Sequence, residues 1–252
     1  MGANLGDANL GFNIFTLLFL GGTFAAALVA GLGGFAFGIV AAGMWLYILS
    51  PLHTATLIMG LGLVVQGYSV WKLRHALDGR RLAPLLIGTA FGVPLGVFVL
   101  AHADPRSLRL GTGVVLVLFS LYGLSQPNLR PIKAALFSGD FCAGFLNGVL
   151  GGATGLAGII AVIWCQLRGW AKDQQRAVFQ PVGVATFALS AAWLGGQGSI
   201  SREVVPLFFA ALPVLLVGTW LGLKFYGKLD EAQFRKLVLV LLLASGVALF
   251  FR

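Results

Sequence analysis

The chain has 252 residues, of which 58% are hydrophobic and only 10% are charged. An ordinary globular domain carries about a quarter charged residues, so this chain has too little polar surface for a water-soluble fold and lipid is its expected solvent. The formal net charge is +9, but the basic residues lie in short loops between apolar runs. That pattern is typical of cytoplasmic loops of membrane proteins and argues against a nucleic-acid partner.

Ten apolar segments follow one another along the chain. Several reach the roughly 17–25 residues that a membrane-spanning helix needs, and long unbroken runs favour helices over the short alternating strands of an outer-membrane barrel. We therefore predict an all-α integral membrane protein. The segments cover residues 12–31, 34–49, 53–71, 82–102, 108–125, 135–151, 153–168, 177–194, 204–225 and 236–251.

Two separate stretches of the first half recur in the same order in the second half. Residues 32–45 resemble residues 150–164, and residues 92–109 resemble residues 217–235. The first match pairs Trp45 with Trp164, and the second pairs Arg109 with Arg235. This duplication predicts two membrane repeats of five segments each, residues 1–126 and 127–252.

An odd number of segments in each half requires the two halves to face opposite ways across the membrane. Loop charge agrees with this inversion, because of the 17 lysines and arginines only Arg106, Arg109, Arg202 and Arg252 fall on the side of the N-terminus. The side rich in basic residues is expected to be cytoplasmic, which places both termini on the periplasmic or outer side. Loop charge leaves open whether the first two segments of each half span fully or form a re-entrant hairpin.

Glycine-rich turns interrupt the apolar sequence at residues 31–34 and 150–155, at corresponding places in the two halves. Inverted-repeat transporters bind substrate near the membrane midplane, often beside such broken helices. A helix that restarts after each turn would present unpaired N–H groups and the positive end of its dipole, which suit a sulfonate, sulfite or carboxylate. The alternative is that these glycines only permit close helix packing. The candidate substrate-binding residues at the turns are Gly33, Gly34, Asn147, Gly151, Gly152 and Thr154.

Polar side chains inside the apolar segments extend the set of candidates. Gln66 and Gln180 lie in corresponding segments and are expected either to bind substrate or to form hydrogen bonds between helices. Asp140 lies well inside a predicted segment and is expected to carry a coupling proton or to pair with Lys133 at the interface.

Three further residues are candidates for coupling or for the entrance to the transport path. His53 lies at the outer end of its segment, where an interfacial residue is the alternative to a proton carrier. Lys172 and Arg176 lie at the cytoplasmic mouth of their segment, where they would attract anions or simply determine topology.

The sequence lacks the common catalytic, nucleotide-binding and metal-binding motifs. It contains no HExxH, GxSxG, P-loop or CxxC pattern, and its three histidines are scattered. We therefore predict no catalytic residue, no metal site and no cofactor, and a protein that is not an enzyme. Without a nucleotide site, transport would draw its energy from an ion gradient or from the substrate gradient.

The chain resembles the TauE/SafE family of sulfite exporters and sulfonate permeases, also called TSUP. The resemblance rests on the duplicated glycine turn, on the run AGFLNGVLGGATGLAG (143–158) and on the stretches that close each half. It implies transport of small sulfur-containing anions across the bacterial inner membrane. The sequence leaves open whether a proton or ion is coupled to transport and whether the protein is a homodimer. The family usually shows a longer glycine run, where this chain has Phe35 and Ala153. The alternative is a drug/metabolite-type exporter, which also has five-plus-five topology.

Overall fold

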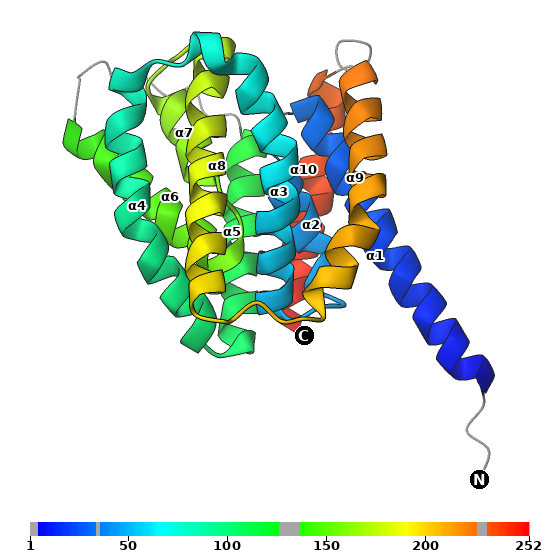
Figure 1. Cartoon of the computed structure of the whole chain (residues 1–252). Helices are drawn as coiled ribbons and strands as arrows, with labels where there is room; N and C mark the ends of the chain where they lie inside the picture. The colour runs from blue at the N-terminus through cyan, green and yellow to red at the C-terminus, as the bar shows by residue number, and fades with distance from the viewer. Residues whose placement is uncertain (1–4, 34–35, 126–136, 226–230, 252) are drawn as a thin grey trace.

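The structure is a computed structural model that describes residues 5–33, 36–125, 137–225 and 231–251 (Figure 1). These residues form ten α-helices and two short 3-10 turns, with no strand among them, and the central part of each α-helix falls in a different predicted segment. The helices are α1 (Leu5–Gly33), α2 (Phe37–Trp45), α3 (Pro51–Leu73), α4 (Gly79–His102), α5 (Pro105–Ser125), α6 (Phe137–Thr154), α7 (Ile159–Leu167), α8 (Lys172–Gly196), α9 (Val204–Phe225) and α10 (Glu231–Ala248). The turns are η1 (Arg74–Ala76) and η2 (Leu249–Phe251).

Six of the described helices are long and apolar enough to cross a membrane, namely α1, α3, α4, α5, α8 and α9. The chain is therefore a multi-pass membrane protein. Helices α2 and α7 have nine residues each. At 1.5 Å per residue each is about 14 Å long, roughly half the thickness of the hydrocarbon layer. Neither predicted segment 34–49 nor segment 153–168 thus contains a full crossing helix.

Helices α4 and α6 run parallel with their backbones in contact. A Cβ atom added to Gly92 would overlap the carbonyl oxygen of Phe145, and one added to Gly144 would overlap that of Leu85. Small residues permit this approach, which is how helices associate in lipid without a hydrophobic driving force. The glycines recur every four residues on both helices, at Gly88, Gly92 and Gly96 and at Gly144, Gly148 and Gly152.

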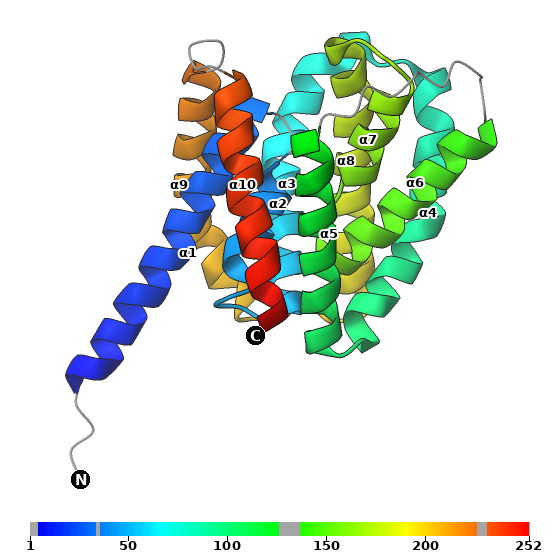
Figure 2. The same cartoon turned by 180° about the vertical axis from the view of Figure 1, so that it is seen from behind.

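Helices α1 and α9 pack in the same way. A Cβ atom added to Gly31 would lie 2.6 Å from the carbonyl oxygen of Thr219, and one added to Gly222 would overlap that of Leu28. These contacts advance together along both helices, so this pair is also parallel. The first helix of each half of the sequence thus packs against the fourth helix of the other half (Figures 1 and 2).

The remaining long helices pair antiparallel. Gly62 of α3 lies against Phe187 of α8, and Gln66 lies against Gly183, so the contacts run in opposite directions along the two helices. Helix α10 also packs antiparallel to α5 (Figure 2). Helix α3 therefore lies at the middle of the bundle, in contact with α2, α8 and α9.

The short helices are tied into the bundle by side-chain hydrogen bonds. Tyr47 donates to the carbonyl of Ser245 at 2.7 Å, and the Ser245 hydroxyl donates to the carbonyl of Gly43, which attaches α2 to α10. The fully buried Trp45 donates its Nε1–H to the carbonyl of Phe19 at 3.3 Å. In the matching position, Trp164 donates to Asp140 Oδ1 at 2.7 Å. Each tryptophan thus ties the last turn of a short helix to the long helix before it.

Basic residues segregate between the two ends of the bundle. Arg74, Arg80 and Arg81 lie around the junction of α3 and α4, and Arg168 follows α7, all at the upper end in Figure 1. At the lower end the described basic residues are Arg106, Arg109 and Arg202. The distribution agrees with the side assignments made from the loops.

Candidate functional site

The second glycine-rich turn separates α6 from α7 inside the bundle. Helix α6 ends at Thr154 and α7 begins at Ile159. Gly155 and Gly158 have φ angles of 75° and 100°, in the left-handed region that glycine adopts at little cost. The break lies a few residues later than the sequence predicted, because Gly151 and Gly152 still belong to α6.

Asn147 caps the start of α7. Its Oδ1 accepts hydrogen bonds from the backbone N–H groups of Gly158 at 2.9 Å and Ala161 at 3.4 Å. Its Nδ2 donates to Thr186 Oγ1 at 3.1 Å, and that hydroxyl donates to the carbonyl of Val182 at 2.7 Å. The Asn147 side chain is fully buried. One neutral amide therefore connects α6, α7 and α8 and occupies the amide-rich end of a half-length helix.

The neighbouring turn residues have packing roles. A Cβ atom on Gly152 would lie 2.9 Å from the carbonyl oxygen of Val93 in α4, and one on Gly151 would overlap the Thr186 side chain. Thr154 donates to the carbonyl of Leu150 at 2.7 Å and accepts from the N–H of Leu156 at 3.2 Å. Thr154 therefore closes the end of α6 and does not cap α7.

The start of α2 meets this turn from the other half of the sequence. A Cβ atom on Gly38 would lie 3.0 Å from the carbonyl oxygen of Gly155 and 3.0 Å from Ile58 Cγ2 of α3. The beginning of α2 thus lies against the turn that precedes α7, beside α3. Gly33 is the last residue of α1, and Gly34 lies outside the described residues.

Two buried amides lie near one another between α3 and α8. Gln66 is 3% exposed, its Oε1 lies against Gly183, and this oxygen has no hydrogen-bond partner in the described residues. Gln180 is also buried and precedes Gly183 by one helical turn, on the same face of α8. The antiparallel packing of α3 and α8 thus places Gln66 within about one helical turn of Gln180 along α8.

Asp140 is bonded to the other end of α7. Its carboxylate is nearly buried, accepts from Trp164 Nε1 and lies 3.9 Å from the Nε of Arg168. The expected alternative partner, Lys133, lies outside the described residues. Arg168 is a functional candidate that was not predicted from the sequence, although its spacing of four from Trp164 places both on one helix face.

The entrance candidates lie at the same end as Asp140, whereas His53 does not. Lys172 begins α8 and Arg176 lies one turn later. Nearby, the guanidinium groups of Arg81 and Arg168 lie 5.2 Å and 5.5 Å from the centre of the Trp170 ring. His53 is in the first turn of α3 at the opposite end. There the backbone N–H of His53 donates to the hydroxyl of Ser50, the N-cap residue, at 3.2 Å.

Most of the chain matches known proteins. A family model described as "Sulfite exporter TauE/SafE" matches residues 18–249. The chain is 26% identical over 225 residues to a Cupriavidus necator protein named "Probable sulfite/organosulfonate exporter TauE", and the match covers 86% of each chain. No solved structure matches the chain.

Proposed function

Because the chain belongs to the TauE/SafE sulfite exporter family, we propose that it is a secondary transporter of small sulfur-containing anions such as sulfite, thiosulfate or organosulfonates. The observation that carries the proposal is the start of α7, a half-length helix whose first amides lie buried in the bundle beneath the Asn147 side chain. A relative from Cupriavidus necator is named a probable exporter, which favours outward transport. The drug/metabolite-type alternative has no such match in its favour.

The proposed architecture is two inverted repeats, residues 1–126 and 127–252. Exchanging the halves turns the parallel pair α1 and α9 into the parallel pair α6 and α4, and it returns the antiparallel pairs of α3 with α8 and α5 with α10 to themselves. The hydrogen bonds of Trp45 and Trp164 also correspond. Such a pattern supports a pseudo-two-fold axis in the membrane plane. The upper end in Figure 1 would then face the cytoplasm and both termini the periplasm.

The proposed substrate site is the region around the start of α7, where the start of α2 meets the turn that precedes α7. The Asn147 oxygen occupies the position at α7 that a substrate oxyanion would take, so the Asn147 side chain would have to move for an anion to bind there. An oxyanion there gains backbone N–H donors and the helix dipole without a buried cation. The other proposed ligand groups are Gly33, Gly34, Gly151, Gly152, Thr154, Gln66 and Gln180. Lys172 and Arg176 would attract anions to the cytoplasmic mouth, and His53 and Asp140 are the proposed coupling groups.

Transport by the purified protein in lipid vesicles tests this function. Vesicles would be loaded with unlabelled substrate, and uptake of labelled sulfite, thiosulfate, sulfoacetate, taurine or an aryl sulfonate would be followed by exchange. We expect at least one of these anions to exchange and a neutral or cationic metabolite not to. If protein that is shown to be folded exchanges none of these sulfur-containing anions, the proposed function is wrong.

Replacing Gln66 by methionine is expected to reduce transport without destabilising the fold. Methionine keeps the length and flexibility of the side chain but removes an amide oxygen that has no partner in the described structure. Removing an unpaired buried polar group is neutral or stabilising by about 1 kcal/mol, so the melting temperature should stay level or rise. Transport should fall at least tenfold if the amide binds substrate. A Gln66→Met protein with wild-type transport would exclude Gln66 from the site.

Replacing Asp140 by asparagine is expected to uncouple transport. The asparagine oxygen still accepts from Trp164, but the charge near Arg168 and the titratable proton are lost. We expect exchange to persist while accumulation driven by a pH gradient disappears. Asp140→Leu, which also loses the Trp164 bond, is the comparison for a purely structural role. Gradient-driven accumulation at the wild-type rate in Asp140→Asn would show that this carboxylate carries no coupling proton.

A further inference from the structure

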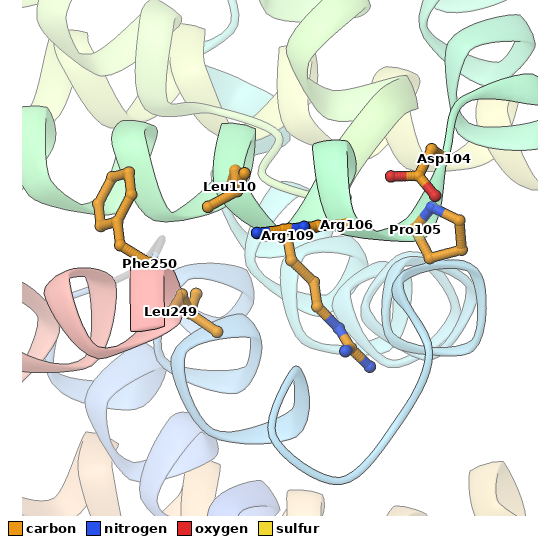
Figure 3. A pocket seen from close by; sticks show the side chains of 7 residues that line it. All are labelled: Asp104, Pro105, Arg106, Arg109, Leu110, Leu249 and Phe250. Carbon is orange, nitrogen blue, oxygen red and sulfur yellow. The ribbon is translucent and has the colours of Figure 1, made fainter. Parts of the chain in front are cut away.

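A second cluster of cationic groups lies at the lower end of the bundle, away from the central site. A pocket of about 280 Å³ separates the start of α5 from η2 (Figure 3). Arg106 and Arg109 line it from α5, and Leu249 and Phe250 line it from the facing side. None of these residues belongs to the proposed transport site.

Arg109 lies in the wall of this pocket and is incompletely satisfied. Its side chain is partly buried, and its Nη2 reaches the carbonyl of Leu49 only at 3.4 Å. Its Nε is buried with no hydrogen-bond partner in the described part of the chain. A guanidinium has five N–H donors in a planar fork, and a buried unpaired donor carries a cost that a suitable acceptor would remove.

The charge around the pocket favours an anion. Within the described residues neither Arg106 nor Arg109 has a carboxylate within 4.0 Å. Asp104 also lines the pocket, but its Oδ2 accepts from the N–H of Ser107 at 3.0 Å and from its hydroxyl at 3.4 Å. It thereby caps α5, whose positive end faces the same region. The pocket therefore has a net positive charge, because it is lined by two guanidinium groups and by one carboxylate that is already hydrogen-bonded to Ser107.

The wall of the pocket opposite α5 is apolar and consists of Leu249 and Phe250. Leu249 is 1% exposed and Phe250 is half-exposed, whereas Asp104, Pro105 and Arg106 on the rim are exposed. The pocket therefore combines a cationic wall with an aliphatic and aromatic one. Its volume is near the lower limit of small-molecule sites, about 300 Å³, and suits a ligand with one charged group and a short apolar substituent.

We propose that this pocket binds a small organic oxyanion, a sulfonate or carboxylate carrying a short apolar group, between Arg109 and the Leu249–Phe250 wall. Arg109 would hold two anion oxygens with its fork, and Arg106 at the rim would add long-range attraction. The choice of a sulfonate head group rests on the proposed function. Binding itself does not, because it requires neither transport nor the central site.

Binding of benzenesulfonate to the full-length protein in lipid-free detergent tests this proposal. Isothermal titration calorimetry would compare wild type with Arg109→Gln, Arg106→Gln and Phe250→Ala, and with Arg202→Gln as the control for an exposed arginine at the same end. We expect Arg109→Gln to weaken binding at least tenfold, Arg106→Gln two- to fivefold and Arg202→Gln not at all. Phe250→Ala should weaken benzenesulfonate but not inorganic sulfate.

Several outcomes would overturn the proposal. Wild-type affinity in both Arg109→Gln and Arg106→Gln would do so, and the exposed Arg106 keeps the test informative if Arg109→Gln fails to fold. Equal binding of sulfate and benzenesulfonate would remove the role of the apolar wall. Native mass spectrometry showing a phosphatidylglycerol adduct, lost in Arg109→Gln, would assign the site to a lipid phosphate instead. Asn147→Asp should impair transport yet leave this binding intact, which distinguishes failure here from failure of the proposed function.

Discussion

Replacing Gly92 by alanine is expected to destabilise the folded state strongly. The new Cβ atom would overlap the carbonyl oxygen of Phe145 and lie 3.0 Å from the backbone nitrogen of Val149. Overpacking a well-packed core usually costs about 1–3 kcal/mol. Here the colliding atoms belong to the backbone of α6 and cannot rotate away, so we expect a cost at or above that range. Helix α6 would move away from α4 and displace Asn147 with it.

Size-exclusion chromatography and thermal unfolding in detergent would measure this effect. The matched control is Gly111→Ala in α5, because a Cβ atom at that position would meet nothing within 4 Å. The control should fold like wild type and be slightly more stable, since alanine is favoured over glycine in a helix by about 1 kcal/mol. Equal behaviour of the two variants would mean that α4 and α6 do not depend on backbone contact.

Replacing Asn147 by leucine is expected to abolish transport and to destabilise the fold. The change removes the acceptor for the N–H groups of Gly158 and Ala161 and the donor to Thr186. Loss of a helix cap costs about 1 kcal/mol and each buried group left unpaired costs about 1–3 kcal/mol. The start of α7 should therefore lose its position even where the long helices remain inserted.

The conservative variant Asn147→Asp separates the two functions of the side chain. An aspartate retains an acceptor for the α7 amides, where a negative charge is favourable, but it cannot donate to Thr186. We expect Asn147→Asp to fold better than Asn147→Leu and to exclude anionic substrate by repulsion. Uptake in vesicles and unfolding temperature measure these effects separately. Normal transport by Asn147→Leu would show that α7 does not need its cap and that the proposed site is wrong.

The structure changes which variants are useful tests of the site. Gly152 is a predicted ligand residue, but its added Cβ atom would lie 2.9 Å from the carbonyl oxygen of Val93. A bulky residue there would disturb packing whether or not Gly152 binds substrate. Gln66 and Asn147 have side chains that can be replaced by isosteres, and they address the site more directly.

The candidate site was predictable in part. The sequence indicated a helix break after residue 150, and α6 does end at Thr154. It also singled out Asn147, although not that its amide would cap α7 eleven residues later. Thr186 left no signal, because its contact with Asn147 depends on how α8 crosses α6. The expected pairing of Asp140 with Lys133 stays a prediction, because Lys133 lies outside the described residues, while Asp140 lies 3.9 Å from the Nε of Arg168.

The amino-acid sequence alone was enough to predict that the chain lies in lipid, that it is helical, and which basic residues share an end of the bundle. These follow from the lengths of apolar runs and from charges between them, which are local properties of the chain. The sequence did not predict that α2 and α7 are half-length, that Gln66 lies against Gly183, or that Arg109 and Leu249 line one pocket; the folded structure shows these. Such contacts depend on where helices cross and in which register, because helices in lipid pack wherever small residues let their backbones approach, and no local pattern specifies that crossing.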